Sequence, residues 1–200
     1  MARMKADERR ERLLEAAEQL MTRDGVAAGT TRAIAAEAGM APSVFHYCFS
    51  SRNELVSELI LRLGGRERQA VWEGVVPSLD MREMLRSAVE AYLSHLTSHP
   101  EQEQVLIELN HYALRTPGMA PLAAQQYEMY YESAAHVLRA AAEFTGSRWR
   151  YGVETMARMA ITIMDGVTLT WLADRDTERT RAVLADLLDH VAALVEPATA

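Results

Sequence analysis

The chain has 200 residues, of which 49% are hydrophobic and 24% charged, and this composition excludes an intrinsically disordered protein. Its single cysteine, Cys48, excludes an internal disulfide framework and favours a reducing compartment. The formal net charge is −7, but it is unevenly spread: residues 1–52 carry eight Lys/Arg and seven Asp/Glu, a balance of +1, which leaves −8 for the rest. A nearly neutral N-terminal segment in an otherwise acidic protein permits DNA binding through that segment but does not establish it.

The sequence predicts a soluble protein of the cytoplasm without membrane contact. No apolar run follows the charged N-terminus, so we expect no signal peptide. The most apolar stretch, residues 156–173, contains Arg158 and Asp165 and falls short of a clean membrane span. The sequence has no Gly-rich phosphate loop, GxSxG motif or CxxC pair, and we expect no cofactor.

Helix-forming residues dominate the composition and predict an all-α fold of about nine helices. The first helix is expected over residues 7–23 and is closed by Asp24-Gly25. Its apolar side chains recur at helical spacing: Leu13, Ala17, Leu20 and Met21.

The segment TTRAIAAEAGMAPSVFHYCF, residues 30–49, has the pattern of two short helices separated by Gly39. Thr30 is a good N-cap for the first helix, and Pro42 suits the first position of the second. Helices this short are marginal in water, so neighbouring helices must brace them. A glycine turn between two short helices is typical of a helix-turn-helix, whose second helix enters the major groove of DNA.

The second short helix has two faces of different chemistry. Phe45, Cys48 and Phe49 are spaced to point inward, and this turns the polar side chains between them outward. The inward position favours Cys48 as a small buried hydrophobe over the alternative of a redox switch. The outward side chains are Ser43, His46 and Tyr47.

The fourth helix is expected to open at Ser51 and Glu54, which stand at capping-box spacing. Gly64-Gly65 interrupts its apolar pattern, which indicates either a helix end followed by a new start or a hinge. Asp80 and Glu83 repeat the capping box at the start of the next helix. The later helices are expected over residues 100–115, 121–144, 148–172 and 178–195, and no strand pattern is evident.

Residues 10–59 resemble the N-terminal domain of the TetR family of transcriptional regulators. The matching segments are LLEAAEQLMTRDG, TTRAIAAEAGM, FHYCF and SSRNEL, in the family's order and at its spacing. Two later stretches, HYALRTPGM and MDGVTLTWLAD, resemble the BetI-like subgroup of C-terminal domains. The resemblance implies a helix-turn-helix DNA-binding domain over residues 1–52 and a helical ligand-sensing and dimerisation domain over residues 53–200.

The resemblance also implies roles for individual residues at the DNA. Thr31 and Arg32 would open the second helix near the DNA backbone. The residues expected to face bases are Pro42, Ser43, Val44 and His46, and those expected to hold phosphates are Tyr47 and Arg52. Few of these side chains make bidentate base contacts, so specificity is expected to rest partly on Arg32, Val44 and DNA shape. For His46 the alternative is a solvated helix histidine.

The last two predicted helices carry wide apolar faces, which either complete the monomer core or form a homodimer interface. We favour the homodimer, because helix-turn-helix proteins use their symmetry to read two half-sites about 34 Å apart. The resulting hypothesis is a dimeric regulator, a repressor in the first instance, on a palindromic operator in double-stranded DNA.

The middle helices are rich in large, soft side chains, and the resemblance implies a small-molecule effector site among roughly the fourth to eighth helices. Core filling is the simpler interpretation for any single residue, but eleven methionines suit an adaptable apolar pocket. The candidate ligand-binding residues are Trp72, Met84, Tyr92, His95, Asn110, His111, Tyr127, Tyr130, Met159 and Asp165. We expect a mostly apolar or aromatic effector that releases the protein from DNA.

Two other classes of function compete with this hypothesis. Glu108 and His111 have the i, i+3 spacing of helical di-iron enzymes, but the sequence has no second Glu-x-x-His pair. Glu132 and His136 stand one turn apart, a spacing that is usually structural. We therefore expect neither an enzyme nor a metal site. A regulator controlled by a protein partner or by its abundance, without a small ligand, remains open.

Overall fold

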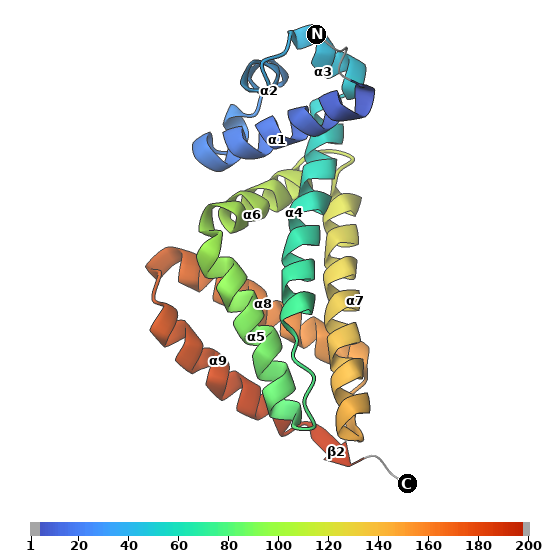
Figure 1. Ribbon diagram of the computed structural model, residues 1–200, viewed down its shortest axis with the longest axis vertical. Coiled ribbons are helices and arrows are strands. Elements are labelled where there is room, and N and C mark those ends of the chain that lie inside the picture. Colours follow the sequence, from blue (N-terminus) through green and yellow to red (C-terminus); the bar gives the residue numbers. More distant parts are fainter. Residues whose placement is uncertain (1–4, 198–200) are drawn as a thin grey trace. The chain divides into compact units, whose positions relative to one another are not determined.

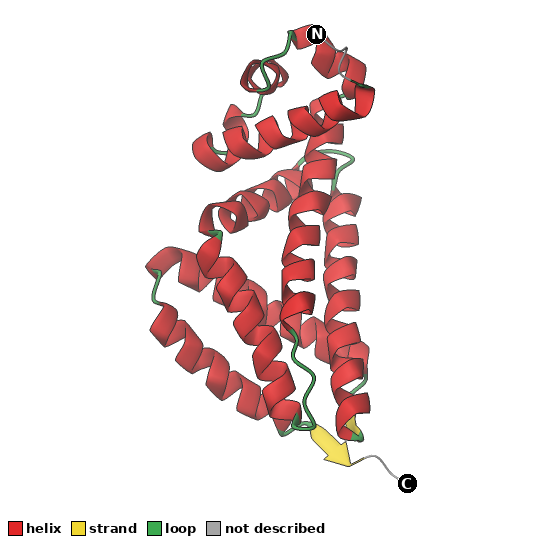
Figure 2. Cartoon of the chain, in the orientation of Figure 1, coloured by secondary structure: helices red, strands yellow, loops and turns green. Residues whose placement is uncertain are grey.

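The computed structural model describes residues 5–197, and within this range the chain forms nine α-helices, one short 3-10 helix and two three-residue strands (Figures 1 and 2). The chain divides into two compact units. The first unit comprises the residues up to Gly64 together with Glu101–Gln126, and the second comprises Gly65–Pro100 together with the residues from Tyr127 on. The expected all-α fold is confirmed, and the expected functional division at residue 52 stays a prediction.

The first unit contains the three N-terminal helices, the start of the fourth, and one helix from later in the chain. Its elements are α1 (Ala6–Asp24), η1 (Val26–Ala28), α2 (Thr31–Glu37), α3 (Pro42–Cys48), the first half of α4 (Arg52–Gly74) and α6 (Pro100–Arg115). One hydrophobic core joins them, because Leu106 and Leu109 of α6 are buried in the same cluster as Leu13 of α1 and Phe45 of α3. The short helices α2 and α3 are thus braced by α1, α4 and α6.

Local chemistry sets the starts of several helices. The side chain of Thr30 accepts a hydrogen bond from the backbone N–H of Ala33 at 3.1 Å, so that Thr30 caps α2 as expected. Pro42 occupies the first turn of α3. Asp80 caps α5 (Met81–Ser98) by accepting from the backbone N–H groups of Arg82 and Glu83. These three helix starts are confirmed.

The fourth helix runs without interruption from Arg52 to Gly74, so the expected helix end at Gly64-Gly65 is wrong (Figure 1). Two glycines cost a helix roughly 1 kcal/mol each relative to alanine, and the buried apolar residues that precede them in α4, Leu59, Ile60 and Leu63, offset that cost. The boundary between the two compact units falls between Gly64 and Gly65. The hinge therefore stays a prediction.

The second unit is built from the rest of α4, α5, most of α7 (Ala120–Thr145), α8 (Val153–Asp174) and α9 (Thr177–Ala192). Helix α9 packs against α5 and α8 (Figure 1). Close packing of α4 on α5 depends on Gly74, because a Cβ atom there would lie 2.2 Å from the Cβ of Ala91. None of the described helices combines the length and apolarity needed to cross a membrane.

Two short strands correct the expected bounds of the last two helices. Residues Ser147–Trp149 form β1, which pairs antiparallel with β2 (Val195–Pro197), so neither Arg148 nor Val195 is helical. The buried indole of Trp149 donates to the backbone carbonyl of Leu138 at 2.9 Å and anchors β1 to α7. Strands of three residues are too short to show an alternating pattern in the sequence.

Candidate DNA-binding face and effector site

Helices α2 and α3 form the expected helix-turn-helix, and Gly39 makes the turn between them. Gly39 has φ +67°, a left-handed conformation that side chains with a Cβ atom rarely adopt. The backbone N–H of Met40 donates to the carbonyl of Ala35 at 2.8 Å and closes the end of α2. Phe45 and Phe49 are buried against α1 and α4, which fixes the rotation of α3 about its axis.

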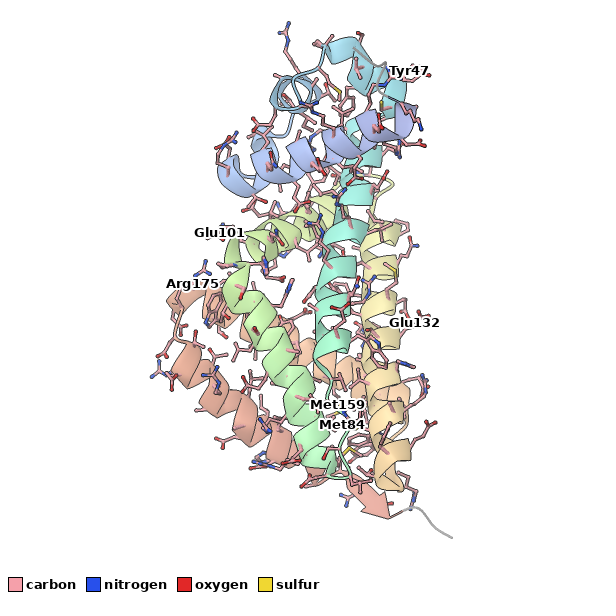
Figure 3. All side chains as sticks on the ribbon, in the orientation of Figure 1. Tyr47, Met84, Glu101, Glu132, Met159 and Arg175 are labelled. Carbon is pink, nitrogen blue, oxygen red and sulfur yellow. The ribbon has the colours of Figure 1, made fainter. Side chains whose placement is uncertain are left out.

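The opposite face of α3 is open to solvent. Pro42, Ser43 and His46 are exposed, Val44 is half-buried, and Tyr47 is 72% exposed. Figure 3 shows Tyr47 pointing away from the helices that hold α3. The structure thus brings five of the predicted DNA-contacting residues onto one helix, with four of them on its exposed face.

Arg10 of α1, which the sequence did not single out, holds the end of α3. Its guanidinium donates to the backbone carbonyl of Cys48 and to the carboxylates of Glu54 and Glu58, at 3.0 and 2.5 Å. The same group lies over the ring of Phe49, with Cζ 4.1 Å from the ring centroid. These contacts join α1, α3 and α4, and Cys48 is half-buried beneath them.

Glu54 is held by three donors. It accepts from the side-chain hydroxyl of Ser50 at 2.6 Å and from the backbone N–H of Ser50 at 2.7 Å, as well as from Arg10. The hydrogen bonds from Ser50, followed by that from Arg10, hold the pKa of the Glu54 carboxyl below its usual range. Its backbone N–H donates to the hydroxyl oxygen of Ser51 at 3.1 Å, which is the expected cap.

Cations flank the exposed face of α3. The guanidinium of Arg9 lies over the ring of Tyr47, with Cζ 5.2 Å from the ring centroid, and Arg32 of α2 is exposed. Arg12 is also exposed, and a Cβ atom on Gly39 would lie 3.8 Å from its Nη2. Arg9 and Arg12 stand one turn apart on α1, where the sequence alone gave no sign that they lie beside α3.

Arg52 makes its contacts inside the first unit, and its expected phosphate contact stays a prediction. Its Nε and Nη2 donate to the backbone carbonyls of Gly29 and Val26 at 2.6 and 2.7 Å. Its guanidinium also lies over the ring of Tyr112 of α6, with Cζ 4.7 Å from the ring centroid. The structure therefore gives Arg52 the role of a brace for the loop that leads into α2. Thr31 is half-buried beside that loop.

An open groove of about 830 Å³ lies beside this brace, between η1 and the end of α6. Arg52, Glu108, His111 and Tyr112 are among its lining residues. The carboxylate of Glu108 accepts from the backbone N–H of Val26 at 3.2 Å, so Glu108 holds η1. In the described part of the chain no three His, Cys, Asp or Glu side chains gather as a metal site would require.

The second unit brings together three of the predicted ligand-binding residues, two tyrosines and one carboxylate, with a further carboxylate that was not predicted. The hydroxyl of Tyr127 donates to Asp165 at 2.9 Å, and the hydroxyl of Tyr130 donates to Glu67. The rings of Tyr127 and Tyr130 meet edge to face with centroids 6.1 Å apart. Burial raises the pKa of Tyr127 and that of Asp165, and the adjacent Asp165 carboxylate raises that of Tyr127 further.

The sequence did not single out four other residues of this cluster. Glu67, only 9% exposed, accepts from Tyr130. Arg68 lies over the ring of Tyr130, and Arg158 lies over the ring of Tyr131, with Cζ-to-centroid distances of 5.5 and 5.0 Å. Their signal in the sequence was weak, because charged residues on a helix are usually solvated.

The remaining predicted ligand-binding residues are dispersed. Met84 and Tyr92 are buried in two different hydrophobic clusters, and the Tyr92 hydroxyl is hydrogen-bonded to Thr168. Trp72 is 45% exposed and lies against the ring of His136, whereas His95 lies against His99. The others are Met159, which is exposed on α8 (Figure 3), and Asn110 and His111, which belong to the first unit.

Comparison with known proteins agrees with this architecture. Residues 13–59 match the family model of bacterial regulatory proteins of the tetR family, and residues 81–196 match that of BetI-type transcriptional repressor C-terminal domains. The chain therefore belongs to the TetR family, with a BetI-type C-terminal domain. It is a DNA-binding transcriptional regulator with a helix-turn-helix, and not an enzyme.

Individual relatives cover almost the whole chain. The sequence is 27% identical over 187 residues to the HTH-type nicotine-responsive transcriptional repressor HdnoR of Paenarthrobacter nicotinovorans, covering 94% of this chain and 95% of that protein. A TetR transcription regulator from Haloarcula marismortui superposes with a TM-score of 0.78 at 18% identity, over 95% and 100% of the two chains. The multidrug binding protein EbrR, complexed with imidazole, superposes with a TM-score of 0.68 at 24% identity, over 90% and 94%.

Proposed function

We propose that the protein is a repressor that binds a palindromic operator as a homodimer and leaves it when a small molecule binds. The observation that carries the DNA half is the exposed face of α3, on which His46 and Tyr47 stand outward beside Arg9. A short helix braced on its apolar side and open on its polar side suits insertion into a major groove.

The side chains on this face are of two kinds, those suited to contact bases and those suited to contact phosphates. The imidazole of His46 can donate to and accept from base edges, and Val44 can contact thymine methyl groups, while Pro42 and Ser43 approach the groove at the start of α3. The phenol of Tyr47 and the guanidinium groups of Arg9 and Arg32 are donors suited to phosphates. Thr31 lies beside Arg32 at the first turn of α2.

The homodimer is supported by the outward face of the last two long helices. On α8, Met159 and Leu169 are exposed, and Val183 of α9 is 48% exposed. Gly166 has no neighbouring atom within 4 Å of where a Cβ would stand, so a partner helix could approach closely there. An exposed apolar face of this kind suits an isologous contact with a second copy.

Release by an effector is supported by the tyrosine and carboxylate cluster of the second unit and by two relatives. HdnoR is described as nicotine-responsive and EbrR as multidrug binding. A ligand that binds better to the form with low DNA affinity shifts the population toward that form. The polar groups beside aromatic rings indicate an effector with an aromatic or apolar body and one or two polar groups.

The experiment that tests the proposal is a protection footprint of the full chain on DNA flanking its own coding region, at two salt concentrations. We expect a protected palindrome whose occupancy falls as salt rises, because phosphate contacts release counterions. Protection of a single half-site at all protein concentrations would contradict the dimer. No protection on these fragments at low salt would contradict regulation of the adjacent genes.

A further inference from the structure

The second unit contains a half-buried arginine, one nitrogen of which is buried without a hydrogen-bond partner. Arg68 lies on α4, with its guanidinium over the ring of Tyr130 and its Nη2 3.8 Å from the sulfur of Met129. Its Nη1 is excluded from solvent, and it has no hydrogen-bond partner among the described residues. An Nη1 carries two N–H donors, and buried donors in folded proteins are nearly always paired.

The nearby acidic groups do not supply that partner. Glu67 accepts the hydroxyl of Tyr130, and Asp165 accepts the hydroxyl of Tyr127. Each of these two carboxylates thus accepts a hydrogen bond from a tyrosine hydroxyl. The N–H groups on Nη1 of Arg68 have no acceptor among the described residues. The group that is missing from this site is therefore an acceptor, and a protonated amine would be repelled by the guanidinium.

The surroundings of Arg68 fit an aromatic body. The rings of Tyr127 and Tyr130 stand at 70° to one another, and Met129 adds a polarisable sulfur that adapts to the shape of a ligand. Gly65 stands three residues before Arg68, where a Cβ atom would lie 3.8 Å from Nη2. A side chain at this position would therefore contact the guanidinium.

We infer that Arg68 is the polar anchor of the effector site and that the effector is an aromatic carboxylate. A guanidinium presents parallel N–H donors that match the two oxygens of a carboxylate, and such charge-assisted pairs are the strongest hydrogen bonds of this kind. The inference rests on the proposed release by a small molecule and adds the chemical class of that molecule.

The test uses three probes of one size on the purified full chain: naphthoate, naphthamide and naphthylmethylammonium. Isothermal titration calorimetry is expected to rank naphthoate first, with at least about tenfold higher affinity than naphthylmethylammonium. Arg68→Met should weaken naphthoate binding by about ten- to a hundredfold, the usual effect of losing a hydrogen bond to a charged group. The matched control is Arg139→Met, which removes an exposed cation of α7 that pairs with Glu154 and should leave naphthoate affinity unchanged.

A second variant distinguishes a direct loss of ligand binding from a loss caused by misfolding. Arg68→Lys keeps the charge but loses the fork of donors, so we expect an affinity between those of the wild type and Arg68→Met, with an unchanged circular dichroism spectrum. Tighter binding of naphthylmethylammonium than of naphthoate would overturn the inference. So would equal losses in Arg68→Met and Arg139→Met, or no naphthoate binding by folded wild type at a concentration on the order of 1 mM.

A gel shift on the footprinted DNA separates this inference from the proposed function. Naphthoate is expected to reduce DNA affinity of the wild type and to leave that of Arg68→Met unchanged. If naphthoate binds through Arg68 without changing DNA affinity, the proposed release by an effector is contradicted, while the role of Arg68 in binding a carboxylate is supported. If DNA is released by naphthylmethylammonium and not by naphthoate, the role of Arg68 as a carboxylate anchor is contradicted, while release by an effector is supported.

Discussion

The guanidinium of Arg52 lies over the ring of Tyr112, with Cζ 4.7 Å from the ring centroid, while it donates to the carbonyls of Val26 and Gly29. The hydroxyl of Tyr112 in turn donates to the side chain of Asn53 at 2.9 Å. Together with the bond from the Val26 N–H to Glu108, these contacts tie α6 to the loop that leads into α2. The position of α6 therefore bears directly on the helix-turn-helix, inside the first unit.

Arg52→Ala is expected to weaken DNA binding through the loop and not through lost phosphate contact. Removing the brace leaves the buried carbonyl of Gly29 without the donor from Arg52, and leaves that of Val26 with the Gly29 N–H. Loss of a hydrogen bond to a buried carbonyl costs about 1–3 kcal/mol of folding stability. In thermal unfolding the melting temperature should fall, while the slope of log affinity against log salt should stay unchanged. A slope reduced by about 0.9 would show instead that Arg52 contacts a phosphate.

Arg9→Ala is expected to show the opposite pattern. Its guanidinium lies beside the exposed ring of Tyr47, so we expect a phosphate contact whose loss reduces the salt slope by about 0.9 and weakens binding to all DNA sequences alike. The control is Arg86→Ala, which removes an exposed cation from α5. Filter binding over a salt series measures both variants, and identical slopes for the two would contradict the role of Arg9.

His46→Ala is expected to change which operator sequences are preferred. The imidazole is exposed on α3 and can reach base edges, so its loss should cost about 1–3 kcal/mol of discrimination at one position of each half-site. Competition binding with every single-base variant of the footprinted operator measures this. Tyr47→Phe, which removes only a hydroxyl suited to phosphate, should weaken all variants equally. An equal loss across all variants for His46→Ala would identify it as a backbone contact.

Glu54→Gln is expected to make the stability of the first unit less sensitive to acid. The hydrogen bonds from Ser50 and Arg10 lower the pKa of Glu54 in the folded state, so its stabilising contribution is present above its unfolded pKa of about 4.3 and is lost as pH falls through the folded pKa. The variant should be less stable than the wild type at pH near 7, with a smaller further loss on acidification below about pH 4.3. Urea unfolding over a pH series measures this, with Glu15→Gln, an exposed position on α1, as the control. Parallel curves for the wild type and Glu54→Gln would refute it.

Leu169→Glu and Val183→Glu are expected to dissociate the dimer. These side chains are 54% and 48% exposed on α8 and α9, and a buried, unpaired carboxylate at a dimer interface is costly. Sedimentation equilibrium should show monomers for either variant at concentrations where the wild type is dimeric. Leu79→Glu is the matched control, because Leu79 is 85% exposed outside the helices and should not affect assembly. Dimers in both interface variants would place the interface elsewhere.

The sequence by itself determined the parts of this protein that depend on neighbours along the chain. The Thr30 cap, Gly39 in the left-handed turn and Pro42 in the first turn of α3 act within four residues, so their spacing in the sequence predicts them. The alternation of buried and exposed positions on α3 follows from helical periodicity for the same reason.

Only the tertiary structure decided the partners of the long charged side chains. Arg52 could have reached a phosphate or a carbonyl, and Arg68 could have been solvated, because each side chain is flexible and its partner is set by which helices pack together. Tyr112 follows Arg52 by 60 residues and Tyr130 follows Arg68 by 62 in the sequence. The grouping of α6 with the N-terminal helices has the same origin, since a hydrophobic face specifies burial but not the helix against which it is buried.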